Sequence, residues 1–453
     1  MANIQAFKNA CIGVPLILPS SSEYPAARKI YQGECNAVPL AIVQPETRAQ
    51  VQQIICAAAQ NGIKVTIRSG GHNIPGLCIQ DNSVTIDMRR IRHVGIAPDK
   101  NSATIGGGAT NLDVARALEA EGLVTPLGLV ATVGFIGWST FGGYGSFMNH
   151  FGLGKDNILG AEIVNAEGEV IQADNEMLRA IRGAGGALGV IVSLRVKVYP
   201  LTKVLAGSLL LDVCNFKPFI LAMEENAFSF PPALQIGTAI FNLPNGKRNF
   251  RVELLWSSPN VEEGRKAIEY LKSIAPPVID SHLQETALSS LITAIDEMIP
   301  PNIYGHNETV SIPRLDNEIL DLVNDFLDQM PKDPATVLAL HHLSPVSPSS
   351  RDGGVLNSSF PIRFGHTMIE FIGSVVHRED RPTSEKWAAD FRDAFRATGK
   401  ALSETYLSMT SPGDRTLQQV YGEEWEELKR SKEKHDPNGL FDLVVPRIRS
   451  GLS

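Results

Sequence analysis

Runs of apolar residues near the start of the chain predict a β-α-β unit. Residues 39–43 form a short apolar run typical of a strand, and a run with helical spacing follows between Thr47, the expected N-cap, and Gly62, the expected stop. The apolar positions of this helix are Val51, Ile54, Ile55 and Ala58. Alternation at residues 65–67 then predicts a second strand, which ends at two consecutive glycines.

Similar patterns continue to about residue 200. Strands are expected at residues 83–88, 93–97, 103–107, 161–164, 169–172 and 190–198. A helix is expected at residues 112–120, with Asn111 as its cap and Gly122 as its stop. The four residues Asn165 to Gly168 form a hairpin signal between two of the strands.

The second half of the chain alternates strand-like and helical runs. The strands are expected at residues 206–213, 234–242, 250–257, 336–340 and 364–371, and the helices at 217–227, 261–274, 316–330 and 383–399. This order is typical of an α+β domain built on a mainly antiparallel sheet. Residues 1–36 show no clear pattern and predict an irregular leader, and residues 344–359, rich in Ser, Pro and Gly, predict a loop or a mobile lip.

Composition narrows the class of protein. The 453 residues are 43% hydrophobic and 20% charged, as in soluble globular proteins, and they suffice for two or three domains. A formal charge of −8 and a pI near 5.7 argue against a nucleic-acid partner or an anionic membrane surface. The apolar runs are too short to span a bilayer, and the first twenty residues make a poor secretory signal. Five cysteines without metal-like spacing favour a reduced, cytoplasmic protein.

The stretch Arg68 to Asn73, RSGGHN, is the first candidate for chemistry. Its paired glycines permit backbone conformations that aim several N–H groups at one point, and Arg68 adds positive charge. Such a turn grips a phosphate oxygen and projects His72 from its end. The alternative is a surface turn with an ordinary hydrogen-bonded histidine.

Residues 127–154 are the second candidate. Eight glycines are interleaved with Val, Phe, Ile and Trp, which is too dense for a regular element and too apolar for a flexible linker. Glycines let a ligand approach the backbone, and the large residues between them would wall a flat hydrophobic group. The alternative is a tightly packed loop under a helix.

Several enzyme classes lack a starting point in this sequence. The glycines at 183–189 follow a helical run and precede a strand, which is the reverse of the order in a nicotinamide-dinucleotide fingerprint. A Walker phosphate loop, a Gly-x-Ser-x-Gly elbow and a His-Glu-x-x-His pair are all absent from the 453 residues.

Three motifs together carry a family resemblance. They are RSGGHN at residues 68–73, TVG to GGYG at 132–145 running into DNILGA at 156–161, and RGAG to GVIV at 182–192. In this order they resemble the FAD-binding domain of the vanillyl-alcohol-oxidase superfamily, and most closely the berberine-bridge-enzyme-like and 6-hydroxynicotine-oxidase-like oxidases. The similarity is strong over about residues 33–203 and returns at VYG, 420–422, and HDPNGLF, 435–441.

The resemblance implies a two-domain α+β fold of the PCMH type. The expected divisions are a leader at 1–32, an FAD-binding domain at 33–205, a substrate domain on a mainly antiparallel sheet flanked by helices at 206–420, and a segment at 421–453 that returns to the FAD domain. One face of the substrate-domain sheet would cover the flavin.

The resemblance also implies the cofactor and its contacts. The Ser69 to Asn73 backbone would hold the FAD pyrophosphate, His72 would bond covalently to the 8α-methyl of the ring, and Ile191 would meet the adenine end. The implied cofactor-binding residues are Arg68, Ser69, Gly70, Gly71, His72, Asn73, Gly76, Thr132, Val133, Gly134, Gly137, Trp138, Gly142, Gly143, Gly145 and Ile191. No metal is implied.

Two departures from the family pattern matter. Bicovalent relatives carry a cysteine where this chain has Val130, so one protein–flavin bond is expected, and Cys56 and Cys78 should not substitute. Relatives often end in an asparagine-containing segment that touches flavin and substrate, whereas the tract here is DLVVPR, residues 442–447. Ordinary amine or alcohol oxidation is therefore less secure.

Acid–base candidates lie in the second half of the chain. A strand at 364–371 would put Phe364, His366, Met368 and Glu370 on one face. His366, Tyr304 and Glu370 are the candidate catalytic residues. Further titratable candidates are His306, His341, His342, Tyr406 and Tyr421. For each of them the alternative is a hydrogen-bonded or surface residue.

The function expected from these observations is an FAD-linked oxidase. A small to medium, partly apolar substrate, a secondary metabolite by family analogy, would lose hydride to flavin N5 while a side chain removes an O–H or N–H proton. O2 would close the cycle as hydrogen peroxide. Two alternatives stay open, a cyclase or isomerase without net oxidation, and a flavin-binding protein without turnover.

Overall fold

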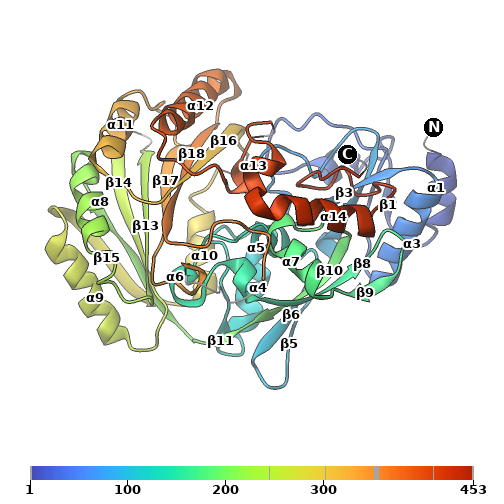
Figure 1. The fold of residues 1–453 in the computed structure, drawn as a ribbon, viewed down its shortest axis with the longest axis horizontal. Helices are drawn as coiled ribbons and strands as arrows, with labels where there is room; N and C mark the ends of the chain where they lie inside the picture. The colour runs from blue at the N-terminus through green and yellow to red at the C-terminus, as the bar shows by residue number, and fades with distance from the viewer. Residues whose placement is uncertain (1–2, 244, 301, 351–356, 412, 451–453) are drawn as a thin grey trace.

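The chain is described by a computed structural model covering residues 3–450, apart from 244, 301, 351–356 and 412. It divides into two regions that lie side by side (Figure 1). The blue to green first part of the chain, with the red C-terminal helices, forms one region, and the light-green, yellow and orange part forms the other.

The first region begins with a four-stranded sheet of order β1-β2-β4-β3. Its strands are β1 (Leu16–Ile17), β2 (Ala41–Val43), β3 (Lys64–Arg68) and β4 (Ser83–Asp87), and the last three run parallel. Helix α3 (Arg48–Gln60) connects β2 to β3 and buries its apolar face, and Thr47 caps its N-terminus through a bond to the Gln50 N–H. The predicted β-α-β unit is confirmed, and it delivers the loop after β3.

A five-stranded antiparallel sheet of order β5-β6-β10-β8-β9 adjoins it. The strands are β5 (Val94–Ile96), β6 (Ser102–Gly106), β8 (Ile158–Val164), β9 (Val170–Gln172) and β10 (Val190–Lys197), and a short pair joins β7 (Leu123–Val124) to β11 (Tyr199–Pro200). Helices α4 (Asn111–Glu119), α5 (Phe135–Thr140), α6 (Met148–Phe151) and α7 (Asn175–Ala184) complete this part. The hairpin at Asn165 to Gly168 is confirmed, and Gly168 supplies a left-handed residue with φ of 80°.

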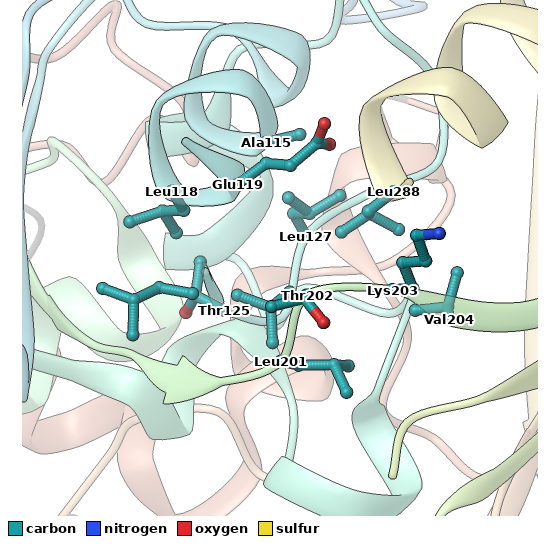
Figure 2. Close-up of a pocket in the computed structure, with 12 residues that line it drawn as sticks. Ala115, Leu118, Glu119, Thr125, Leu127, Leu201, Thr202, Lys203, Val204 and Leu288 are labelled. Carbon is teal, nitrogen blue, oxygen red and sulfur yellow. The ribbon is translucent and has the colours of Figure 1, made fainter. Parts of the chain in front are cut away.

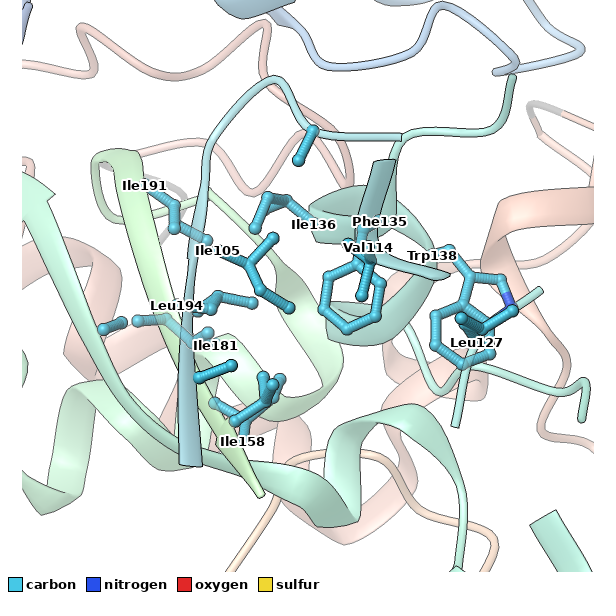
Figure 3. Packing of buried hydrophobic residues seen from close by; sticks show 14 of the residues in the cluster. Ile105, Val114, Leu127, Phe135, Ile136, Trp138, Ile158, Ile181, Ile191 and Leu194 are labelled. Atoms are coloured by element: carbon cyan, nitrogen blue, oxygen red, sulfur yellow. The ribbon is translucent and has the colours of Figure 1, made fainter. Parts of the chain in front are cut away.

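The core of this region packs the helices against the five-stranded sheet. Figure 3 shows Ile105 and Leu194 from the sheet facing Val114 of α4 and Phe135 and Ile136 of α5. These side chains are at most 6% exposed. The packed core therefore fixes the backbone of the glycine-rich segment from behind.

The second region is a seven-stranded sheet of order β15-β12-β14-β13-β17-β18-β16, antiparallel throughout. The strands are β12 (Val204–Leu211), β13 (Leu234–Asn242), β14 (Arg248–Trp256), β15 (Val278–Thr286), β16 (Tyr304–Ile312), β17 (Thr336–Leu343) and β18 (His366–Val375). Helices α8 (Phe216–Glu225), α9 (Val261–Ile274), α11 (Asn317–Asp328) and α12 (Arg381–Ala397) lie on its outer face, away from the first region (Figure 1).

Strand alternation divides the sheet into two faces. On β14 the residues Phe250, Val252 and Leu254 are buried in the core beneath the outer helices. Their neighbours Arg251 and Glu253 point to the opposite face, which looks toward the first region. The predicted α+β fold, with an antiparallel sheet covered by helices on one side, is confirmed.

Helix α10 (Leu288–Asp296) links the two regions. It packs against α4, and the Glu119 carboxylate of α4 accepts a bond of 3.2 Å from the Ser289 N–H at its N-terminus. Figure 2 shows Leu118, Leu127 and Leu288 around a small pocket near this contact. The volume of this pocket is about 10 Å³, close to the minimum that a single water needs. The pocket is therefore a packing gap between α4 and α10 and not a ligand site.

The C-terminal segment returns to the first region. Helices α13 (Leu417–Tyr421) and α14 (Trp425–His435) lie over it, and the Val65 N–H of β3 donates to the Leu440 carbonyl at 3.3 Å. Among the described residues, none of the helices has the length and hydrophobicity that crossing a bilayer requires. Cys11, Cys35, Cys56, Cys78 and Cys214 are free thiols.

Several local predictions are wrong. Residues 1–36 are not irregular, because they contain α1 (Ile4–Ala10), β1 and α2 (Tyr24–Arg28). Thr110, rather than Asn111, caps α4, with its hydroxyl accepting from the Asp113 N–H. Phe364 lies before β18 begins, so it does not share a strand face with Glu370.

The predicted lip at 344–359 falls partly outside the described residues, which exclude 351–356. Its first part packs against the first region, where the Ser349 hydroxyl contacts the buried Asp156 carboxylate and the Ser347 hydroxyl donates to the Met148 carbonyl at 2.7 Å. This part of the segment is therefore a packed connection between the two regions.

Candidate functional site

A cavity of about 1170 Å³ lies where the two regions meet. Its walls come from the loop after β3, the glycine-rich segment after residue 127, the inner face of the seven-stranded sheet, and α10. Pockets for one small molecule usually have volumes of about 300–1000 Å³. The cavity therefore has room for a cofactor and a substrate together.

The loop after β3 lines the cavity through Ser69, Gly70, Gly71, His72 and Asn73. It touches the glycine-rich segment at positions where no side chain fits. A Cβ on Gly70 would lie 2.2 Å from the Gly134 nitrogen, and a Cβ on Gly134 would lie 2.3 Å from the Gly70 nitrogen. Gly71 has a φ of 83°, which disfavours other residues.

His72 is half-buried and held on two sides. Its Nε2 is bonded to the Thr132 hydroxyl at 2.8 Å, and its ring stacks on Tyr31 with centroids 4.5 Å apart. Burial, with a smaller contribution from the Arg68 charge, lowers the pKa of His72 to about 4. The imidazole is therefore neutral at physiological pH.

Arg68 does not line the cavity. Its guanidinium donates to the Ala27 and Lys29 carbonyls, both at 2.7 Å, and is 4% exposed. The Arg68 charge was expected on the phosphate side of the loop. It is instead directed into the N-terminal segment, and its hydrogen bonds hold that segment beneath the loop. Burial lowers the pKa of Arg68.

The glycine-rich segment both lines the cavity and packs tightly against neighbouring elements. Residues that line the cavity are Val133, Gly134, Gly137, Trp138 and Gly145, together with Ile191 of β10. Thr132, Gly142, Gly143 and Gly76 are not part of its lining. Two of these serve packing, since a Cβ would lie 2.8 Å from the Phe360 ring at Gly142 and 2.8 Å from the Gly154 backbone at Gly143.

Asn111 is a wall residue that sequence reasoning misses, because it assigns the residue to a helix cap. The side chain is fully buried and its Nδ2 donates to the Val130 carbonyl at 3.2 Å. Its Oδ1 has no partner within the described protein. Buried polar atoms are usually paired, so a ligand carrying an N–H or O–H group fits here.

The walls also show what replaces the two family features. Val130, Val444 and Val445 line the cavity, so apolar side chains stand there. Cys78 lines it too, but burial raises the pKa of this thiol to about 12. It is protonated and a poor nucleophile at neutral pH.

Glu370 is the centre of a polar group on the sheet face of the cavity. Its Oε1 accepts from Asn307 Nδ2 at 3.0 Å, and its Oε2 lies 3.4 Å from His341 Nε2. All three residues line the cavity. Glu370 therefore lines the same cavity as His72.

His366 acts behind the cavity wall. It is 3% exposed and does not line the cavity, but its Nε2 is 2.6 Å from the hydroxyl of Tyr144, which does. Its Nδ1 is 2.7 Å from the Phe364 carbonyl, which can only accept, and burial lowers the pKa of His366 to about 4. The neutral ring therefore donates from Nδ1 and accepts the Tyr144 proton at Nε2.

The other titratable candidates divide between wall and support. Tyr406 lines the cavity, edge-on to Tyr144 at 5.1 Å. Tyr304 is half-buried against Gly33 and does not line it, and His306 pairs with Glu385 at 3.4 Å. His342 bonds to Thr238 and Thr367 side chains. Tyr421 is buried and donates to the Gly183 carbonyl at 3.1 Å.

The residues fit FAD. A glycine-only contact between two loops offers N–H groups for a diphosphate, and apolar walls at Trp138, Ile136 and Ile191 suit a flat ring. Asn111 Oδ1 offers an acceptor, and His72 a neutral nitrogen. Among the described residues there is no group of three or more His, Cys, Asp or Glu side chains that could hold a metal ion.

Comparison with known proteins decides the family. Residues 39–174 match the model of the FAD binding domain. The FAD-linked oxidoreductase aurO of Gibberella zeae is 31% identical over 439 residues, which cover 95% of this chain and 84% of that protein. This chain belongs to the FAD-linked oxidoreductases.

Other relatives place the enzyme within the vanillyl-alcohol-oxidase superfamily, as predicted. The (R)-6-hydroxynicotine oxidase of Paenarthrobacter nicotinovorans is 34% identical over 197 residues, covering 42% of this chain and 43% of that enzyme. Wild-type BBE-like 1 of Physcomitrella patens has the same fold, with a TM-score of 0.84, 22% identity and coverage of 96% and 97%. The chain thus has the fold of a berberine-bridge-enzyme-like protein.

Proposed function

We propose that this enzyme is an oxidase that joins FAD to His72 by one bond and oxidises a small to medium, partly apolar secondary metabolite with O2 as acceptor. The observation that carries the proposal is that a neutral imidazole and a carboxylate, His72 and Glu370, line the same cavity. Relatives named (R)-6-hydroxynicotine oxidase and O-acetylstemmadenine oxidase support oxidation of an organic molecule.

The surroundings of His72 favour a tether. Within the described protein Nε2 is bonded to Thr132, while Nδ1 has no partner, so Nδ1 is the nitrogen available for a bond. With FAD bound, a bond from His72 Nδ1 to the flavin methyl carbon would replace one C–H of that methyl. The two hydrogens released, one from the methyl and one from the imidazole, would pass with two electrons to O2 and give hydrogen peroxide.

A single protein–flavin bond is expected because the position at which bicovalent relatives carry a cysteine has no reactive side chain in this chain. Val130 has no nucleophile, and the protonated Cys78 thiol is not activated by a neighbouring base, since burial dominates its pKa. Neither Val130 nor Cys78 is therefore expected to add a second bond beside the one we assign to His72.

Glu370 is the base we assign for the substrate. Asn307 and His341 hold its two oxygens, so the carboxylate is fixed in direction and presented to the cavity. It takes the proton from a substrate O–H or N–H, while bound FAD supplies the two-electron acceptor for the C–H bond. Over a full cycle the substrate loses two hydrogens and O2 becomes hydrogen peroxide.

The test is anaerobic mixing of the purified flavoprotein with fractions of a small-molecule extract, followed by admission of air. The proposal predicts that an active fraction bleaches the flavin absorbance and that air restores it with release of peroxide. The variant Glu370→Gln should slow bleaching about a hundredfold or more, because a general base contributes roughly that much. The control Glu262→Gln, at an exposed glutamate in the first turn of α9 on the outer face of the sheet, should bleach at the normal rate.

Other outcomes contradict the proposal in different ways. A fraction that is converted without any bleaching would identify a cyclase or isomerase. This alternative is motivated by the C-terminal tract, which presents the apolar side chains of Val444 and Val445 to the cavity. Bound FAD with no converted compound in any fraction would identify a binding protein.

A further inference from the structure

The sheet face of the cavity carries charge at two separate places. Cross-strand register puts Glu370 of β18, Ala339 of β17, Ala239 of β13 and Arg251 of β14 in one row, and all four line the cavity. Neighbouring strands are about 4.8 Å apart, so the backbones of Glu370 and Arg251 are separated by about 14 Å. A ligand that meets both groups must be elongated.

The floor between the two charges is low. Ala339 and Ala239 project only a methyl group each, and the next row puts Gly237 between His341 and Glu253. A Cβ added at Gly237 would meet nothing closer than 3.8 Å, so space is open above it. A slot with a flat, small-residue floor suits a planar molecule.

Arg251 is placed to receive an anion. Its guanidinium lies over the Phe241 ring, 4.7 Å from the centroid, and the side chain is half-buried. In the described part of the chain it makes no ion pair and no hydrogen bond with another side chain. A guanidinium presents a rigid fork of donors that matches the two oxygens of a carboxylate.

Glu253 is the competing charge at this end. It lies two residues along the same strand, opposite Gly237, and it does not pair with Arg251 within 4.0 Å in the described residues. Glu253 is exposed, whereas Arg251 is half-buried under the cavity. Water and salt screen the exposed charge more strongly, so the field inside the slot is dominated by Arg251.

We propose that the substrate is an elongated, planar aromatic molecule whose carboxylate binds Arg251 at the end opposite the reacting group. The small-residue floor carries the ring system, and the Phe241 ring supports the Arg251 guanidinium that lies over it. This assignment rests on the proposed function for one point only, which is that the reacting O–H or N–H lies at Glu370.

The test measures binding, so it does not depend on turnover. The probes are 6-hydroxy-2-naphthoate, a planar fused-ring molecule with a phenol at one end and a carboxylate at the other, and its methyl ester, used in equilibrium dialysis against the holoprotein. The acid should bind the native protein about tenfold more tightly than the ester, or better, because a hydrogen bond to a charged group is worth that much. Arg251→Gln should remove this preference and leave ester binding unchanged.

Two variants keep the test independent of folding. Glu253→Gln should bind the acid as tightly as the native protein or up to a few-fold more tightly, since it removes a like charge. Ala239→Leu should weaken both probes by filling the floor between the two charges. Near-ultraviolet circular dichroism of all the variants should match that of the native protein.

Equal binding of acid and ester, no binding of either, or an unchanged preference in Arg251→Gln would overturn the assignment. Failure of the proposed function gives a different pattern. In that case the acid preference and its loss in Arg251→Gln persist, while no compound bleaches the flavin.

Discussion

At the scale of single residues, environment decides what each histidine does. Burial lowers the pKa of His72 and His366 to about 4 and that of His342 to about 3. All three rings are neutral near pH 7, but only His72 faces the cavity through a loop that a cofactor can approach. His366 reaches the site only through the Tyr144 hydroxyl.

His366 gives a prediction with a defined sign. The pKa of His366 is about 4 in the folded protein and 6.5 in the unfolded chain. Between pH 4 and pH 6.5 the ring is therefore protonated in the unfolded chain but neutral in the folded protein. Native stability should therefore fall as the pH falls from 6.5 to 4, by about 1.4 kcal/mol per pH unit from this ring. His366→Phe should cost about 1–3 kcal/mol at neutral pH, because Tyr144 loses its acceptor. Its stability should then converge with that of the native protein on acidification.

Urea unfolding at a series of pH values measures both effects. The control is His377→Gln, since the exposed His377 ring is solvated in both states. Parallel curves for His366→Phe and the native protein would show that the ring is not held neutral.

At the scale of single residues, the sequence indicated a functional role where the residue type is common in only a few structural settings. Two consecutive glycines before a histidine indicated a ligand loop, and the structure puts Gly70 against Gly134 with no space for a side chain. Asn111 and Arg251 carried no such signal. Their role comes from a partner or an open space supplied by distant segments, which a linear pattern does not reveal.

At the scale of elements, apolar periodicity located those that bury one face. Helix α9 has the bounds expected from its pattern, and β13 and β14 were found within a few residues. Strand β15 was missed because it is an edge strand with mostly exposed, polar residues. Strand β16 was missed because its polar residues are buried against the cavity and their neighbours.

Helix α14 shows how the C-terminal segment is held. The fully buried Lys432 ammonium contacts the Asp436 carboxylate at 2.6 Å and donates to the Ala187 carbonyl at 3.1 Å. Asp436 in turn accepts from the N–H groups of Leu440 and Phe441, at 2.7 and 2.9 Å. This pair ties the return segment to the loop between α7 and β10.

Lys432→Met should destabilise the protein by about 3–5 kcal/mol, because it leaves the Asp436 carboxylate buried without its partner. The matched control is Lys434→Met on the same helix, whose solvent-exposed pair with Glu176 should contribute far less, because water and salt screen it. Chemical unfolding gives both values. Equal losses in the two variants would mean that the buried pair does not anchor the segment.

At the scale of the whole molecule, the cavity exists only because two regions meet. The first supplies His72 and the glycine contact, and the second supplies Glu370 and Arg251 from one row of its sheet. The family motifs predicted the fold and the FAD-binding domain, and the residue-level contacts of the cofactor stay predictions. The substrate half could not be predicted, because cross-strand register sets which of many polar residues face inward.

One imidazole in this cavity is expected to hold FAD, and mass spectrometry under denaturing conditions detects that bond. The intact native protein should be heavier by one FAD, the added mass should lie on the peptide containing His72, and the variant His72→Ala should lose it while Cys78→Ala keeps it. A native protein that releases all its flavin on denaturation, or a His72→Ala variant that retains it, would show that His72 does not hold the cofactor.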